Sequence, residues 1–131
     1  MCVRTRRINL CMRSPQRTVL IVDDDRQILR LVEKMLRPQG VNLLSADRPS
    51  EALRICEGQP VHVLISDVAM PEMAGGKLAE RLLKLQPEAR VLLISGQAKV
   101  PAVAKLPNVR FLRKPFFPAV LLQNLRELLE P

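Results

Sequence analysis

The chain has 131 residues and a mass of 14.8 kDa, which suits one domain with one buried core. Apolar residues make up 47% and aromatic residues only 2%, so the core must be aliphatic, and no apolar run approaches the ~20 residues of a membrane span. The net charge of +8 suggests a nucleic-acid partner, but five arginines and no acidic residue lie within the first 17 residues. Most of the excess charge therefore belongs to a tail, and no recognition motif supports a nucleic-acid-binding module.

Residues 1–16 form this basic tail, and they show no hydrophobic period and end at a Ser14-Pro15 break. We predict that they are disordered, with Met12 as an alternative start, and that the folded domain spans residues 17–131. A functional basic arm is the alternative interpretation. Cys2, Cys11 and Cys56 lack metal-ligand spacing, so they are interpreted as ordinary thiols of a reducing compartment. The absence of a signal-peptide pattern favours a cytoplasmic protein.

After the tail, short apolar runs alternate with amphipathic stretches. The predicted strands are residues 19–22, 41–44, 61–66, 91–94 and a fifth that contains 110–112. The predicted helices are residues 26–37, one that begins at Pro49, one after the loop VAMPEMAGG, and Pro118–Leu129. Their expected inward residues are Ile28, Leu31, Val32, Met35 and Leu36; Ala52, Leu53 and Cys56; Leu78, Leu82, Leu83 and Leu85; and Leu121, Leu122, Leu125 and Leu128.

Strands that are apolar on both faces, each followed by a helix, indicate a parallel sheet that is covered on both sides. Because crossover connections are right-handed, we expect a doubly wound α/β fold with five strands in the flavodoxin-like order 2-1-3-4-5. Only 18 residues separate Ser95 from Lys114, and two of them are Pro101 and Pro107. The fourth helix should therefore be short or irregular.

Acidic residues follow the first and third strands, which are neighbours in this order. Asp23 and Asp24 follow the first strand, in TVLIVDDD, and Asp67 follows the third, in LISDVAMP. Asp25 is suited to the N-cap of the next helix. Two charges about 4 Å apart repel by roughly 4 kcal/mol at an effective dielectric near 20, so the converging carboxylates require a cation, a proton or open water.

Two further motifs lie at the carboxyl ends of later strands, Ser95 in LLISG and Lys114 in RKPF. Taken in order, the acid pair, D-x-x-M-P, S-G and K-P-F, the sequence from Thr18 to about Glu130 resembles the receiver domain of bacterial two-component response regulators. The S-G pair and the LAERL stretch are more similar to receivers of hybrid histidine kinases. Ala74 departs from the pattern, because receivers usually have Asp or Asn at this position.

The resemblance implies a Mg²⁺ site, because this hard cation prefers oxygen ligands. Asp24 and Asp67 would bind the ion directly, Asp23 would bind it directly or through water, and Ala69 would supply its backbone carbonyl. Asp67 would be the phosphoacceptor, taking a phosphoryl group from a phosphohistidine.

The resemblance also assigns roles to residues after the later strands. Lys114 and Ser95 would contact the phosphoryl group, and Phe111 would follow Ser95 inward in a conformational switch. The implied protein catalyses its own phosphorylation and dephosphorylation and is not a classical enzyme. Its partners would be a histidine kinase or histidine phosphotransferase and a downstream protein, without direct DNA binding. The chain could be a stand-alone receiver or part of a hybrid kinase.

An enzyme of the haloacid dehalogenase type is the alternative. Such phosphatases place D-x-D after a strand, which Asp23 and Asp25 match, followed by residues such as Ser95 and Lys114. They also need an acidic pair after the lysine, and Asp67 would have no role in them. The acidic residues that follow Lys114 are Glu127 and Glu130, both predicted to lie at the final helix. His62 is interpreted as a packed residue, and Lys114-Pro115 as a candidate cis peptide.

Overall fold

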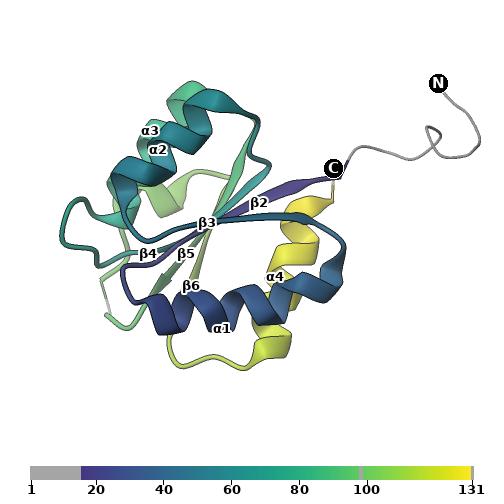
Figure 1. Cartoon of the computed structure of the whole chain (residues 1–131). Coiled ribbons are helices and arrows are strands. Elements are labelled where there is room, and N and C mark those ends of the chain that lie inside the picture. Colours follow the sequence, from purple (N-terminus) through teal and green to yellow (C-terminus); the bar gives the residue numbers. More distant parts are fainter. Residues whose placement is uncertain (1–15, 98, 131) are drawn as a thin grey trace, which may run out of the picture.

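The computed structural model describes residues 16–97 and 99–130. Cys2, Cys11, Met12 and all of the predicted tail except Gln16 lie outside the described residues. The strands, labelled as in Figure 1, are β2 (Thr18–Val22), β3 (Asn42–Ala46), β4 (Val63–Asp67), β5 (Arg90–Ser95) and β6 (Val109–Arg113). They form one parallel sheet in the order β3-β2-β4-β5-β6, which confirms the predicted order 2-1-3-4-5.

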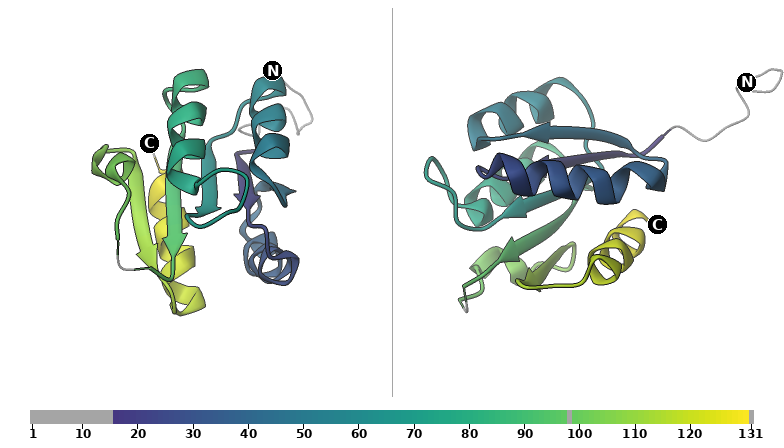
Figure 2. Two further views of the ribbon diagram at one scale, coloured as in Figure 1. Left: turned by 90° about the vertical axis from the view of Figure 1, so that its left-hand side faces the viewer. Right: turned by 60° about the horizontal axis from the view of Figure 1, so that its bottom comes forward.

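The helices cover both faces of this sheet. They are α1 (Arg26–Leu36), α2 (Pro49–Gly58), α3 (Gly75–Leu85) and α4 (Pro118–Leu129), with short 3₁₀ segments η1 (Arg37–Gln39) and η2 (Ala102–Lys105). Helices α2 and α3 lie on one face and α1 and α4 on the other, as Figures 1 and 2 show. Each face therefore has its own aliphatic core, centred on Leu20, Leu64 and Leu93 under α2 and α3, and on Ile21, Ile65 and Leu92 under α1 and α4.

Helix α1 begins at the predicted cap, because the Asp25 carboxylate accepts hydrogen bonds from the N–H groups of Gln27 and Ile28. Its inward face was predicted partly wrongly. Leu29, Val32 and Leu36 are buried, whereas Leu31 is 50% exposed. At 100° per residue, Leu31 lies about 200° around the helix from Leu29, so both cannot face the core.

Helix α3 corrects a second prediction of burial. Leu78 and Leu82 are fully buried as expected, but Leu85 is 49% exposed. Leu85 is the last helical residue and lines a shallow groove between α2 and α3, together with Leu53 of α2. The helical period therefore gives the correct face of α3 but does not show where along the helix the core ends.

The third predicted strand begins later than the apolar run. Strand β4 starts at Val63, and His62 precedes it. The His62 Nδ1 atom accepts the N–H of Thr18 at 2.8 Å, at the amino end of β2. The histidine thus serves as a hydrogen-bond acceptor for the backbone, far along the strands from Asp67.

The connection between β5 and β6 contains a single short 3₁₀ segment among its described residues, which confirms the expected short or irregular fourth helix. Segment η2 buries Val103 and packs against α3. A Cβ atom on Gly76 of α3 would lie 3.1 Å from the Cβ of Pro101. This close approach lets a short segment cover the sheet where a longer helix would otherwise lie.

The carboxyl end of α4 is held by arginines from two strand regions. Arg17 donates to the carbonyl of Leu129 at 2.7 Å, and Arg90 donates to the carbonyls of Leu128 and Glu130. Cations suit this helix terminus because its last carbonyl groups lack partners within the helix. The final turn of α4 is thereby fixed to the amino ends of β2 and β5.

A buried and an exposed leucine of α1 allow a matched test of which face of this helix packs on the core. Leu29→Ala should lower the free energy of unfolding by about 2–4 kcal/mol, because it removes buried methyl groups. Leu31→Ala should change it by less than about 0.5 kcal/mol, as expected of an exposed position. Urea unfolding followed by circular dichroism measures both. Equal losses in the two variants would contradict the observed orientation of α1.

Candidate functional site

Three carboxylates meet at the carboxyl ends of β2 and β4. The parallel register pairs Val22 with Ser66, so Asp23 and Asp67 follow on neighbouring strands. One carboxylate oxygen from each of Asp23, Asp24 and Asp67 lies within 4.8 Å of the other two. The structure therefore brings together the three aspartates that the sequence placed at one edge of the sheet.

Asp23 is the most buried member of this acidic cluster, with 6% of its surface exposed. Burial raises the pKa of its carboxyl group, and the negative charges of Asp67 and Asp24 raise it further. The Asp25 N–H, which donates to Asp23 Oδ1 at 2.9 Å, and the Lys114 ammonium lower the same pKa. Burial and repulsion prevail, so Asp23 carries its charge at a cost in free energy.

Lys114 is the cation that faces the cluster. Its Nζ atom lies 3.8 Å from Asp67 Oδ1, and the Lys114 side chain is 34% exposed while that of Asp67 is 13% exposed. The Lys114 N–H donates to the carbonyl of Ser95, which ties the residue to the end of β5. The Lys114-Pro115 peptide is cis, as the sequence suggested.

The two predicted switch residues lie on neighbouring strands. Ser95 ends β5 and is 1% exposed, and its Oγ atom accepts the N–H of Gln97 at 2.9 Å. Phe111 of β6 pairs with Leu93 in the sheet and is half-buried against the core under α2 and α3. Ser95 and Phe111 thus lie on adjacent strands.

The donor set of the acidic cluster fits a hard divalent cation. An octahedral Mg²⁺ binds oxygens at about 2.0–2.1 Å, so its ligand atoms lie about 3–4 Å apart. The cluster oxygens lie within 4.8 Å of one another before any ion draws them together. Ala69, two residues after Asp67, is exposed, and its N–H donates weakly to Asp67 Oδ1 at 3.4 Å. The repulsion from Asp67 and Asp24, which helps to raise the pKa of Asp23, is a second feature that a cation would relieve.

The model of the response regulator receiver domain matches residues 19–126. The chain belongs to this family. The receiver domain is similar to the transcriptional regulatory protein GlrR of Escherichia coli strain K12, with 33% identity over 115 residues that make up 86% of this chain and 26% of GlrR. It is also 28% identical over 114 residues to the receiver protein CpdR of Brucella abortus strain 2308, covering 85% of this chain and 95% of CpdR.

A solved structure supports the same assignment. The receiver domain of the hybrid histidine kinase CckA superposes with a TM-score of 0.75 and 30% identity, covering 86% of this chain and 99% of that one. The chain spans only about a quarter of the length of GlrR, one of the curated relatives that it matches. Family and fold place it in two-component signalling, and nothing in these similarities favours the haloacid dehalogenase alternative.

The local geometry also disfavours that alternative. Its D-x-D motif requires Asp25 to act with Asp23, but both hydrogen bonds of the Asp25 carboxylate go to the first turn of α1. The clustered acids are Asp23, Asp24 and Asp67 instead. Asp67, which would have no role in such a phosphatase, belongs to this cluster and pairs with Lys114.

Two residues beside Asp67 were missed by the sequence reasoning. Ser66 is fully buried, and its hydroxyl donates to the backbone carbonyl of Asp67 at 2.9 Å. Gly75 donates its N–H to the Val68 carbonyl at 2.8 Å, and a Cβ atom on it would lie 2.2 Å from the Asp67 carbonyl oxygen. The glycine pair that begins α3 was a visible signal, whereas the sequence does not show which group the Ser66 hydroxyl would contact.

Gly75→Ala should destabilise the receiver domain by about 1–3 kcal/mol, because the added methyl group must displace the Asp67 backbone. Gly58→Ala is the matched control, since nothing lies within 4 Å of its Cβ position at the end of α2. That variant should be neutral or slightly stabilising. Urea unfolding compares the two, and similar free energies of unfolding would show that α3 does not approach Asp67 closely.

Asp23→Asn should raise the melting temperature of the metal-free receiver domain by a few degrees at pH 7. The raised pKa means that folding favours the protonated Asp23, so stability contributed by this proton is present at low pH and lost as pH rises through the folded pKa. The advantage of the variant should therefore vanish below about pH 4, where a carboxyl of an unfolded chain titrates. Thermal melts in chelator from pH 3.5 to 7 measure it, and an advantage independent of pH would contradict the assigned cause.

Proposed function

We propose that Asp67 is the phosphoacceptor of this receiver domain and takes a phosphoryl group from a phosphohistidine in a Mg²⁺-dependent reaction. The observation that carries the proposal is the position of Asp67, which lies close both to the acidic pair that follows β2 and to the Lys114 ammonium. One of its oxygens is near Lys114, and the side chain remains 13% exposed, so the carboxylate is reachable.

The proposed transfer forms one bond and breaks another. An Asp67 carboxylate oxygen attacks the phosphorus, and the bond between phosphorus and the donor imidazole nitrogen breaks. The donor ring, which carries a proton on its other nitrogen, keeps that electron pair and leaves as neutral imidazole. The product is an acyl phosphate on Asp67. Charge develops on the oxygens of the transferring group, and the Lys114 ammonium, 3.8 Å from Asp67 Oδ1, would stabilise it.

The residues proposed to hold Mg²⁺ are Asp23, Asp24, Asp67 and the backbone carbonyl of Ala69. When bound, the ion would neutralise negative charge at the carboxylates and at the phosphoryl oxygens. The close oxygens of the cluster and the raised pKa of Asp23 support this assignment. The Ser66 hydroxyl, which donates to the Asp67 carbonyl, would help to hold the Asp67 backbone in place, and Gly75 leaves room for that carbonyl because it has no Cβ.

Ser95 and Phe111 are proposed to turn phosphorylation into a conformational change. The Ser95 hydroxyl would leave the Gln97 N–H and donate to the phosphoryl group, and Phe111 would move into the space beside it. The connection between β5 and β6, which contains η2, joins the strands that carry both residues, so it would shift with them. For this switch to operate, the phosphoryl group must make contacts in one conformation of the domain that it does not make in the other.

The proposed partners are a histidine kinase or a histidine phosphotransferase as donor and a separate protein as target. The folded domain of residues 17–131 would catalyse its own phosphorylation and dephosphorylation. Similarity to the receiver of the hybrid histidine kinase CckA supports a phosphorelay with such a kinase. Among the described residues, no helix is both long and apolar enough to cross a membrane.

Intact mass spectrometry after treatment with acetyl phosphate tests the assignment of Asp67. The wild-type chain should gain one phosphoryl group only when Mg²⁺ is present, and Asp67→Asn should gain none. Asp25→Asn is the matched control, because asparagine keeps the cap of α1 and Asp25 lies outside the cluster. Labelling of Asp67→Asn, together with loss of labelling in Asp25→Asn, would favour the phosphatase alternative instead.

A further inference from the structure

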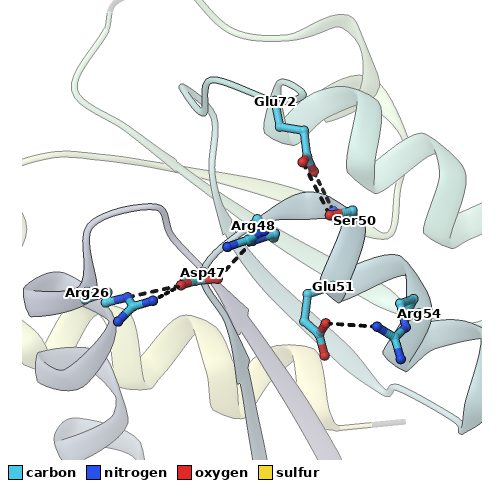
Figure 3. A network of polar contacts seen from close by, with 7 residues as sticks. All are labelled: Arg26, Asp47, Arg48, Ser50, Glu51, Arg54 and Glu72. Atoms are coloured by element: carbon cyan, nitrogen blue, oxygen red, sulfur yellow. Dashed lines mark hydrogen bonds and ion pairs between the residues drawn. The ribbon is translucent and has the colours of Figure 1, made fainter.

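The loop between β4 and α3 is attached to the beginning of α2. Figure 3 shows the Glu72 carboxylate of this loop facing Ser50, and it accepts the Ser50 N–H at 2.7 Å and the Ser50 hydroxyl at 3.3 Å. The same loop contains Ala69 and directly follows Asp67. The Glu72 side chain thus connects the loop that follows Asp67 to the beginning of α2, which lies far from it in the sequence.

Helix α2 lacks a side-chain cap from its own N-cap residue, so the contact between Glu72 and Ser50 takes the place of that cap. The N-cap residue Arg48 makes no side-chain hydrogen bond to the helix, and Pro49 at its first position has no N–H. Ser50 therefore supplies the first backbone donor of α2. A carboxylate is the favoured partner at this position, because the first N–H groups of a helix lack partners within it and carry partial positive charge.

The other side of the acidic cluster is attached to the same helix end. Asp47, just before α2, accepts hydrogen bonds from Arg26 Nε at 3.1 Å and Arg26 Nη2 at 2.8 Å (Figure 3). The Arg26 guanidinium lowers the pKa of Asp47, so this pair is charged at neutral pH. Arg26 is the first residue of α1 and follows the run Asp23–Asp25 directly.

The beginning of α2 therefore holds both loops that form the acidic cluster. The link from Asp47 to Arg26 positions the residues after β2, and the link from Glu72 to Ser50 positions the residues after β4. Mg²⁺ accepts little deviation from octahedral geometry, so its affinity depends on the separation between the two sets of ligands. A change in either link should change that affinity without touching a ligand.

We propose that Glu72 is a positioning residue for the metal site, because its hydrogen bonds to Ser50 hold the loop after Asp67 at the separation from Asp23 and Asp24 that Mg²⁺ requires. This inference rests on the proposed function. Glu72 does not belong to the acidic cluster and acts through the loop. Both partners are exposed, so we expect a modest effect, roughly a three- to tenfold change in the Mg²⁺ dissociation constant, as for loss of a helix cap.

Isothermal titration with Mg²⁺ tests the proposal through three variants. Glu72→Ala removes the hydrogen bonds and the charge and should weaken Mg²⁺ binding three- to tenfold. Glu72→Gln removes the same charge but keeps an oxygen acceptor for Ser50, so it should restore most of the affinity. Glu51→Ala is the matched control, because Glu51 lies in the first turn of α2, pairs with Arg54 and makes no hydrogen bond to the loop (Figure 3).

Amide hydrogen exchange on the metal-free protein supplies a second measurement that does not depend on the ion. Exchange in residues 68–75 should be faster in Glu72→Ala than in wild type, Glu72→Gln or Glu51→Ala. Equal Mg²⁺ affinities for Glu72→Ala and Glu72→Gln would overturn the inference, because the hydrogen bonds to Ser50 would then have no effect of their own. Unchanged exchange in the loop would also overturn it. A wild-type chain that binds no Mg²⁺ while the loop still loosens in Glu72→Ala would refute the proposed function instead.

Discussion

Repulsion among three carboxylates at one edge of the sheet is the interaction on which the functional part of this molecule depends. The strand order puts β2 beside β4, and their register leaves Asp23 and Asp67 next to each other where the strands end. A core of aliphatic side chains keeps these strands parallel and in place. The fold therefore uses hydrophobic free energy to hold negative charges closer than they would remain in water. The partially exposed Lys114 offsets only part of this repulsion, which makes the cluster receptive to cations.

Much of this arrangement was predictable from the sequence, because it depends on local patterns. Apolar runs identify the strands, the crossover rule limits their order, and Asp25 has the chemistry of a helix cap. The period of α1 was also visible, and Leu29 rather than Leu31 satisfies it with Val32 and Leu36. The exposure of Leu85 was not predictable in this way, since it depends on where the neighbouring helix α2 stops covering α3.

The hydrogen bonds of Ser66 and Glu72 that support the loop around Asp67 could not be predicted, and the reason is a different one. Ser66 contacts the carbonyl of the next residue, and Glu72 caps a helix that begins 23 residues earlier in the chain. Such contacts follow from how loops pass one another in three dimensions and leave no period or spacing in the sequence. Gly75 lies between these cases, because a glycine at the start of a helix signals a close approach but does not identify the group approached.

Arg17 and Arg90, which bind the end of α4, offer a way for a movement of the sheet to reach the end of the chain. Their acceptors are backbone carbonyls, which do not titrate and which no side-chain substitution removes. Arg90 is the first residue of β5, the strand that ends at Ser95, so a sliding movement of β5 along its own axis would pull directly on the last turn of α4. Strand β5 would then transmit a movement from the edge of the sheet that carries the acidic cluster to the opposite edge, where α4 ends. Chain that follows α4 would register that movement at its point of attachment, without any rearrangement of α2 or α3.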